Sequence, residues 1–136
     1  MAYRCVIIDD EQLARKLLQN YCAKTASLEV VRSFKSALEA LPFIKEQSID
    51  LIFLDIQMPQ ISGLDFLKTL NNRNFQVILT TAHREYALDG FELNVIDYLL
   101  KPIAFPRFIK AIDKLISSKK KQSKTINEQS ITVKSG

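Results

Sequence analysis

The chain has 136 residues, with 19 Lys and Arg, 15 Asp and Glu, one His, two Cys, three Gly and a formal net charge of +4. This length fits one domain, and 47% hydrophobic with 25% charged residues is typical of a globular protein. One His and two Cys exclude a structural zinc site and a disulfide framework, and three Gly exclude a Walker loop or a dinucleotide fingerprint.

Short aliphatic runs alternate with amphipathic segments along the chain. The runs are apolar on both faces, which is typical of a parallel sheet covered by helices on both sides; they lie at residues 4–8, 29–31, 51–54, 76–79 and 98–100. Helical spacing of apolar residues follows at 13–21, 64–70 and 108–115, and Ser36 with Glu39 resembles a capping box that opens another helix. Pro42 predicts a kink or a later start of that helix. We therefore expect an α/β fold with a doubly wound (βα)5 parallel sheet.

The composition changes after Ser118. Residues 119–130 are polar and basic without an apolar period, which is typical of a linker, and residues 131–136 have the pattern of another strand. We predict a folded domain over residues 1–118, a basic linker over 119–130 and the start of a truncated C-terminal domain over 131–136. The net charge lies in residues 119–136, which hold five Lys and one Glu, whereas residues 1–118 are neutral overall.

The first apolar run leads directly into acidic residues, unlike a secretory leader, and no apolar run approaches the ~20 residues that cross a bilayer. We therefore expect a cytoplasmic protein without membrane insertion.

Carboxylates follow the first and third predicted strands at the point where each strand ends. Asp9, Asp10 and Glu11 follow residues 4–8, and Asp55 follows residues 51–54. Each Asp alone is equally typical of a turn or a helix cap. The carboxyl ends of parallel strands meet at one edge of a sheet, so we expect Asp9, Asp10 and Asp55 to share one depression. Such a cluster must hold a proton or a cation, and oxygen ligands with open positions suit Mg²⁺.

Two further strand ends supply groups that suit phosphoryl chemistry. Asp55 stands alone after its strand, and a carboxylate beside Mg²⁺ can act as a nucleophile and form an aspartyl phosphate. The fourth and fifth strands run into Thr81, a hydroxyl donor, and Lys101, a cation that can bind a phosphoryl oxygen. Separately, Thr81 and Lys101 are ordinary strand-end and surface residues. Together with the carboxylates they indicate a phosphoryl site.

The order of these motifs resembles the receiver domain of response regulators in two-component signalling, across about residues 3–118. The matching segments are Ile7–Glu11, Leu54–Pro59 with Ser62–Gly63, Thr80–Ala82 and Asp97–Pro102. The resemblance implies a flavodoxin-like sheet with strand order 2-1-3-4-5 and a phosphorelay partner, a sensor histidine kinase. It implies these site residues: Asp55 as phospho-acceptor; Asp9, Asp10, Asp55 and the backbone carbonyl of Gln57 as Mg²⁺ ligands; Thr81 and Lys101 as phosphoryl contacts; and Thr81 with Tyr98 as the switch.

A narrower resemblance concerns the output of the protein. Residues 81–82, 85–87, 91–92 and 97–102 are similar to receivers attached to LytTR-type DNA-binding domains, and residues 131–136 resemble the first strand of such a domain. This implies transcription regulation, with DNA bound by the missing C-terminal domain and a homodimer formed on activation.

Two other functions remain open. A small Mg²⁺-dependent phosphatase with an aspartyl nucleophile would resemble haloacid-dehalogenase-type enzymes, which place a second Asp two residues after the nucleophile; this chain has Gln57 there. A phosphorylation-independent interaction module is disfavoured by the acidic residues, Thr81 and Lys101. We predict a signalling domain rather than an enzyme, with Mg²⁺-dependent self-phosphorylation and autodephosphorylation as its only chemistry.

Overall fold

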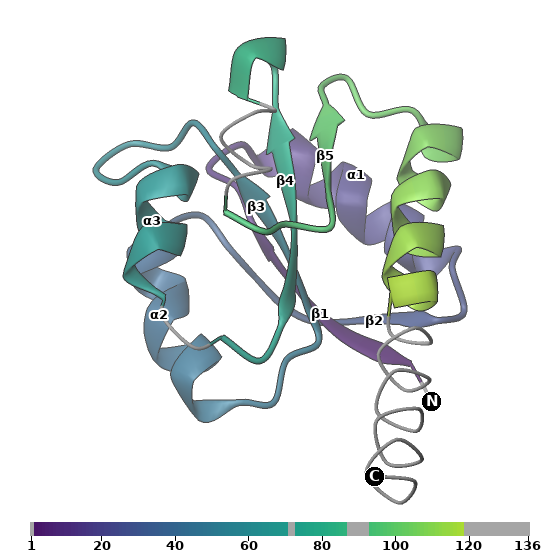
Figure 1. Cartoon of the computed structure of the whole chain (residues 1–136), viewed down its shortest axis with the longest axis horizontal. Coiled ribbons are helices and arrows are strands. Elements are labelled where there is room, and N and C mark those ends of the chain that lie inside the picture. The colour runs from purple at the N-terminus through teal and green to yellow at the C-terminus, as the bar shows by residue number, and fades with distance from the viewer. Residues whose placement is uncertain (1, 71–72, 87–92, 119–136) are drawn as a thin grey trace, which may run out of the picture.

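The computed structural model describes residues 2–70, 73–86 and 93–118. Strands and helices alternate along the chain (Figure 1). They are β1 (Tyr3–Ile8), α1 (Gln12–Ala23), β2 (Leu28–Phe34), α2 (Ala37–Glu46), β3 (Leu51–Asp55), α3 (Gly63–Thr69), β4 (Gln76–Thr81), a 3-10 turn η1 (Arg84–Tyr86), β5 (Asp97–Leu100) and a helix over residues 105–118, here called the C-terminal helix.

The five strands form one parallel sheet in the order β2-β1-β3-β4-β5, which confirms the predicted fold class. Figure 1 shows α2 and α3 on one side of the sheet, and α1 with the C-terminal helix on the other. Alternate residues of each strand therefore face different helices, and both faces are apolar because both are covered. None of the described helices is long and apolar enough to cross a membrane.

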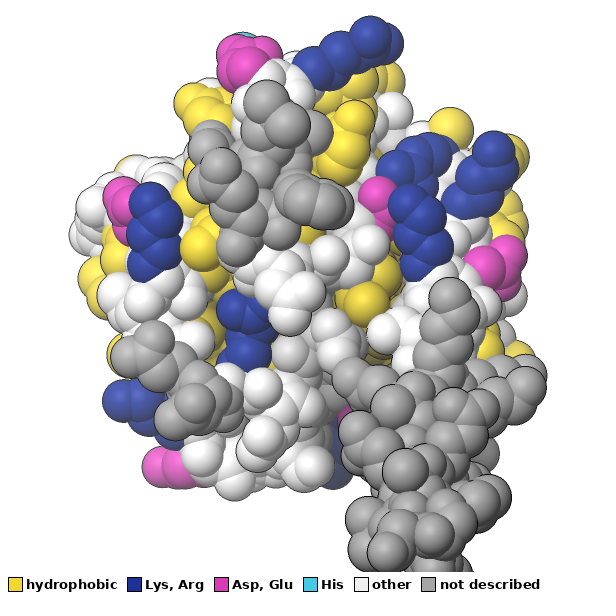
Figure 2. All heavy atoms as spheres, in the orientation of Figure 1, with side chains coloured by type: hydrophobic (Ala, Val, Ile, Leu, Met, Phe, Trp, Pro, Cys, Tyr) yellow, Lys and Arg dark blue, Asp and Glu magenta, His cyan; other side chains and the backbone are white. Residues whose placement is uncertain are grey.

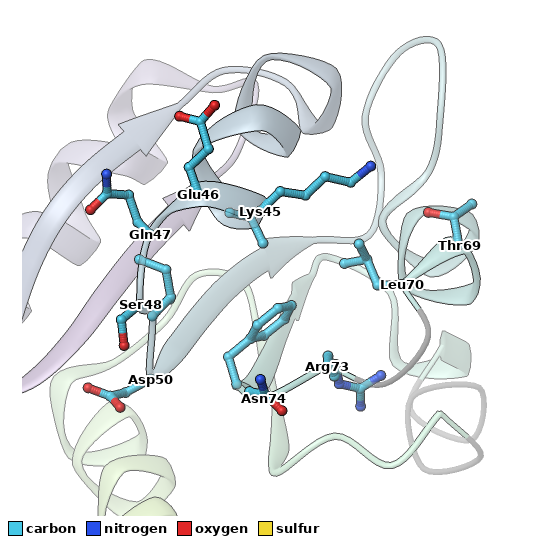
Figure 3. A pocket seen from close by; sticks show the side chains of 12 residues that line it. Lys45, Glu46, Gln47, Ser48, Asp50, Thr69, Leu70, Arg73 and Asn74 are labelled. Atoms are coloured by element: carbon cyan, nitrogen blue, oxygen red, sulfur yellow. The ribbon is translucent and has the colours of Figure 1, made fainter.

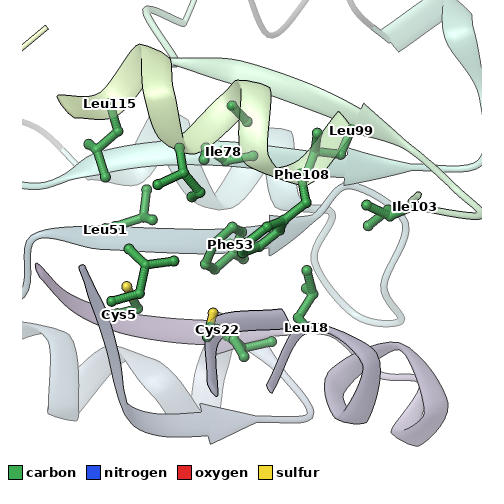
Figure 4. Packing of buried hydrophobic residues seen from close by; sticks show 14 residues of the cluster. Cys5, Leu18, Cys22, Leu51, Phe53, Ile78, Leu99, Ile103, Phe108 and Leu115 are labelled. Carbon is green, nitrogen blue, oxygen red and sulfur yellow. The ribbon is translucent and has the colours of Figure 1, made fainter. Parts of the chain in front are cut away.

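The face under α1 and the C-terminal helix is filled by a cluster that Figure 4 shows from close by. Phe53 of β3 stacks on Phe108 of the C-terminal helix, with ring centroids 5.6 Å apart. Cys5 and Cys22 are buried in this cluster as free thiols. Burial raises the pKa of Cys22 to about 12 and that of Cys5 further still, so both behave as unreactive core side chains.

Two details of the predicted elements differ from the structure. β2 extends over Leu28–Phe34, beyond the predicted residues 29–31. The prediction of a later start for α2 is wrong: Ser36 Oγ accepts a hydrogen bond from the Glu39 amide at 3.2 Å, and α2 begins directly after this cap with Pro42 in its interior. The cap satisfies an amide that the first turn leaves without a partner, which favours the early start.

Part of the predicted organisation lies outside the described residues. A (βα)5 fold has a fourth helix between its fourth and fifth strands; between β4 and β5 the described residues contain one helical element, η1, and residues 87–92 lie outside them. The predicted linker over 119–130 and the predicted strand over 131–136 also lie outside them.

An ion-pair network around the buried carboxylate of Asp97 joins β5 to the C-terminal helix. Asp97 is 7% exposed, and its carboxylate accepts hydrogen bonds from both terminal nitrogens of Arg107, at 2.8 and 2.9 Å. The ammonium of Lys114 lies 3.2 Å from the same carboxylate. Arg107 also donates to the carbonyl of Tyr98 at 2.9 Å. On the face drawn in Figure 2, Lys and Arg side chains gather over the C-terminal helix. The network therefore fixes this helix beside Tyr98.

Arg107→Ala is expected to lower the free energy of unfolding by about 2 kcal/mol at pH 7. This is less than the ~3–5 kcal/mol lost when a fully buried pair is broken, because Lys114 stays beside Asp97. Burial alone would raise the pKa of Asp97, but the hydrogen bonds from Arg107 outweigh it and hold that pKa below its usual range. The network therefore stabilises the fold above about pH 4 and loses its contribution as the pH falls through the lowered pKa. Urea unfolding at pH 7 and pH 3 checks this, with the exposed Lys110→Ala as control; an equal loss at both pH values would contradict it.

Candidate functional site

The carboxyl ends of β1 and β3 bring four carboxylates together. One oxygen from each of Asp9, Asp10, Glu11 and Asp55 lies within 4.8 Å of the others. Asp9 is fully buried and Asp55 is 2% exposed, whereas Asp10 and Glu11 are exposed. The predicted juxtaposition of Asp9, Asp10 and Asp55 is therefore present, because β1 and β3 are neighbouring parallel strands.

Lys101, the residue after β5, reaches into this cluster. Its Nζ lies 2.9 Å from Asp9 Oδ2, 3.1 Å from Glu11 Oε1 and 3.5 Å from Asp55 Oδ2. The peptide bond between Lys101 and Pro102 is cis. One ammonium thus faces three carboxylates, and the cluster keeps an excess of negative charge.

This excess shifts the pKa values of the buried groups. Burial, the nearby charge of Asp9 and, to a smaller extent, that of Asp10 raise the pKa of Asp55 to about 7, although Lys101 and a hydrogen bond from the Gln57 amide act in the opposite direction. Burial alone would lower the pKa of Lys101, but its contacts with Asp9 and Asp55 outweigh burial and raise it. Asp55 therefore binds a proton or a cation readily at neutral pH.

Backbone contacts hold the two buried carboxylates in place. Asp9 Oδ1 accepts a hydrogen bond from the Glu11 amide at 2.9 Å, and Arg15 Nη1 donates to the carbonyl of Asp9 at 2.7 Å. Asp55 Oδ1 accepts from the Gln57 amide at 3.3 Å. The cluster is thus built on rigid strand ends and the turns that follow them.

The start of α3 packs directly against the end of β3. The Gly63 amide donates to the carbonyl of Ile56 at 2.8 Å, and Ser62 Oγ caps α3 by accepting from the Asp65 amide at 3.1 Å. A Cβ atom at position 63 would lie 2.2 Å from the carbonyl oxygen of Asp55. Only glycine permits this approach, which sets the path of the chain after Asp55.

Thr81 and Tyr98 lie at the same edge, but within the described residues neither side chain forms a hydrogen bond with the carboxylates. Thr81 is fully buried, and its Oγ1 accepts from the amide of His83 at 3.0 Å. The Lys101 amide donates to the carbonyl of Thr81 at 2.7 Å, so the two predicted phosphoryl contacts are linked through the backbone. Tyr98 is half-buried and packs against the apolar cluster under α2 and α3.

The donor set fits Mg²⁺. It consists of carboxylate oxygens, two of them exposed, and Asp9 Oδ2 accepts no well-directed hydrogen bond within the described residues even though Lys101 Nζ lies near it. Asp9, Asp10 and Asp55 would hold the ion, and water would complete its shell. Gln57, whose carbonyl is the other predicted ligand, is exposed and directly follows Ile56 at the end of β3.

Two cavities lie at opposite ends of the sheet. A cavity of about 460 Å³ adjoins the carboxylates and is lined by Asp10, Ile56, Gln57, Met58, Pro59, Ser62, Leu64 and Tyr86. A cavity of about 560 Å³ lies where α2 and α3 end and β3 begins, and Figure 3 shows its lining side chains, Asp50 and Glu46 among them. The first cavity therefore opens directly beside Asp10 and Gln57.

Three contributions to the site were not predicted. The contact of Glu11 with Lys101 joins residues 90 positions apart, and no local pattern signals it. The hydrogen bond from Arg15 to the Asp9 carbonyl was not predicted either, because a basic residue near the start of a helix such as α1 is usually exposed to solvent. Gly63 was noted as part of a motif, and its position between a cap Ser and a helical pattern is the signal for a close backbone approach.

Comparison with known proteins agrees with this geometry. The chain is 41% identical over 117 residues to an uncharacterized response regulatory protein of Vibrio cholerae, covering 85% of this chain and 49% of that protein. It is 35% identical over 132 residues to the transcriptional regulatory protein BtsR of Escherichia coli, covering 94% of this chain and 55% of BtsR. The chain thus spans about half the length of these curated relatives.

A solved structure has the same fold as this chain. The response regulatory domain of protein mrkE from Klebsiella pneumoniae is 31% identical, with a TM-score of 0.76 over 85% of this chain and 96% of that domain. Residues 5–113 match the family model of the response regulator receiver domain. The chain therefore belongs to the receiver domain family of the response regulators.

Proposed function

We propose that Asp55 of this receiver domain accepts a phosphoryl group from a sensor histidine kinase, with Mg²⁺ bound beside it. The observation that carries the proposal is the position of Asp55: a buried carboxylate 3.5 Å from Lys101 Nζ, within a group of oxygen donors that lie within 4.8 Å of one another. This arrangement pairs a nucleophile with a cation and with ligands for a second cation.

The transfer exchanges one bond of phosphorus for another. An oxygen of ionised Asp55 attacks the phosphorus, the bond to the donor histidine nitrogen breaks, and that nitrogen leaves with the electron pair. Bound Mg²⁺ supplies charge neutralisation for the phosphoryl oxygens. Lys101 binds one of these oxygens as a point charge. Since the pKa of Asp55 is about 7 in the metal-free domain, cation binding also favours the ionised form that attacks.

Thr81 and Tyr98 are the proposed switch. Thr81 Oγ1 would leave the His83 amide, from which it now accepts at 3.0 Å, and donate to the phosphoryl group. The half-buried ring of Tyr98 would then turn into the space next to Thr81. Because Arg107 donates a hydrogen bond to the Tyr98 carbonyl, this movement would be transmitted directly to the C-terminal helix.

We further propose that the domain regulates transcription through an attached output domain. BtsR carries the name of a transcriptional regulatory protein, and this chain spans about half of it. An output domain of the LytTR type that binds DNA, a homodimer formed on activation and a cytoplasmic location are the predictions that complete this proposal.

The test is phosphorylation by acetyl phosphate with Mg²⁺, followed by mass spectrometry of the intact protein. One acid-stable, hydroxylamine-labile phosphoryl group is expected on the wild type and none on Asp55→Asn, because the amide is no nucleophile. The exposed Asp113→Asn is the control and is expected to be labelled like the wild type. Undiminished labelling of Asp55→Asn would overturn the assignment, and sustained turnover of a generic phosphomonoester would favour the phosphatase alternative.

A further inference from the structure

Glu11 is the N-cap residue of α1, but its side chain makes no capping hydrogen bond to that helix. It turns instead to the Lys101 ammonium, with Oε1 3.1 Å from Nζ. We propose that this contact retains Lys101 in the unphosphorylated receiver and must be released when Lys101 binds the phosphoryl group, so that Glu11 lowers the affinity for that group. The proposal rests on the proposed function of Asp55.

Lys101 Nζ lies within 3.5 Å of three carboxylates, and its contact with Glu11 Oε1 has the geometry of a hydrogen bond. An ammonium has three N–H groups, and here three carboxylates surround it. The distance to Asp55 Oδ2, 3.5 Å, is the longest of the three, against 2.9 Å to Asp9 and 3.1 Å to Glu11. Lys101 therefore lies nearer to the β1–α1 turn than to the phospho-acceptor, and a phosphoryl group on Asp55 competes for it.

Glu11 is the partner that Lys101 releases at the lowest cost. Its side chain is 65% exposed, whereas those of Asp9 and Asp55 are 1% and 3% exposed. A carboxylate that loses its partner in the interior keeps an uncompensated charge, but water solvates an exposed one. Phosphorylation should thus preserve the Asp9 contact and break the Glu11 contact.

Two variants separate the contact from the charge of Glu11. Glu11→Gln removes the charge and leaves Lys101 only a neutral amide oxygen as acceptor. Glu11→Asp keeps the charge but shortens the side chain, and Asp is a preferred N-cap residue that would bond to the first turn of α1 instead. Both variants are expected to bind beryllofluoride, the phosphoryl mimic, about two- to fivefold more tightly than the wild type, the range expected for one exposed ion-pair contact. The affinity is measured at Mg²⁺ concentrations shown to saturate each protein.

Glu46→Gln is the matched control, since it removes one exposed glutamate at the opposite end of the sheet (Figure 3). It is expected to leave the beryllofluoride affinity unchanged. Tighter binding by Glu11→Gln with wild-type affinity in Glu11→Asp would mean that charge alone acts, and it would overturn the proposal. Unchanged affinity in both variants would overturn it as well.

A second readout needs no phosphoryl mimic. In protein labelled with ¹³C at lysine Cε, both Glu11 variants are expected to shift the Lys101 resonance before beryllofluoride is added, and Glu46→Gln is not. An unshifted Lys101 resonance would show that the contact is absent and overturn the proposal. A wild-type protein that binds no beryllofluoride with saturating Mg²⁺ would instead refute the proposed function of Asp55, which keeps the two failures distinct.

Discussion

Asp55→Asn is expected to raise the free energy of unfolding of the metal-free domain by up to about 4 kcal/mol at pH 8 and to leave it nearly unchanged at pH 4. The pKa of Asp55 rises from 3.8 to about 7 in the folded state, because the carboxyl group is buried beside Asp9. At about 1.36 kcal/mol for each pH unit, ionisation above pH 7 costs the folded state this amount. The uncharged amide avoids the cost.

The sign of the pH dependence follows from the raised pKa. The folded state retains the Asp55 proton more strongly than the unfolded chain, so wild-type stability falls as the pH rises from about 4 to 7. The advantage of Asp55→Asn grows over the same window and is constant above it.

Urea unfolding in EDTA, followed by circular dichroism because the chain lacks Trp, measures this difference. Asp113→Asn, an exposed site on the C-terminal helix, serves as control. Mg²⁺ is expected to stabilise the wild type and to have a smaller effect on Asp55→Asn, since binding to the folded state alone shifts the equilibrium. A destabilised Asp55→Asn at pH 8, or an equal gain at pH 4 and pH 8, would contradict the expected origin of the effect.

The strands of this fold are predictable because covered parallel strands must be apolar on both faces. β1 and β3 contain uninterrupted apolar runs, Cys5–Ile8 and Leu51–Leu54, that lead directly into acidic residues, so the place of these strands and the edge that carries Asp9 and Asp55 follow from the pattern. β2 is harder to delimit, since Glu29, Arg32 and Ser33 interrupt its apolar residues at the edge of the sheet. The order of the strands came from the resemblance to receivers, and the pairing confirms it.

The contacts that hold the site together depend on geometry that local patterns do not contain. Glu11 and Lys101 meet only because β1 and β5 end at the same edge of the sheet. Asp97 belongs to the motif of residues 97–102, but its pairing with Arg107 depends on where the C-terminal helix packs relative to β5. Of the two alternatives predicted from Pro42, a kink or a later start of α2, the later start is wrong because the Ser36 cap fixes the beginning of the helix ahead of the proline.

Gly63→Ala is expected to lower the free energy of unfolding by about 3 kcal/mol. In the interior of an ordinary helix the same change stabilises by up to about 1 kcal/mol, because alanine has the higher helix propensity. Here the added Cβ would lie 2.2 Å from the carbonyl oxygen of Asp55 and 3.0 Å from the Cα of Ile56, and these are backbone atoms that cannot rotate away. The start of α3 must therefore move off β3, and the 2.8 Å hydrogen bond from Gly63 to Ile56 weakens.

The same displacement carries a consequence for the site. Gln57, whose amide holds Asp55 Oδ1 at 3.3 Å, lies in the turn between Ile56 and Gly63. Gly63→Ala should thus weaken Mg²⁺ binding as well as stability, and it should do so without changing any side chain of the carboxylate cluster. Urea unfolding and Mg²⁺ titration by NMR measure the two effects, with the exposed Lys68→Ala in α3 as control for helix propensity. A Gly63→Ala protein as stable as the control would mean that α3 can shift freely, and the position of Asp55 would then depend on β3 alone.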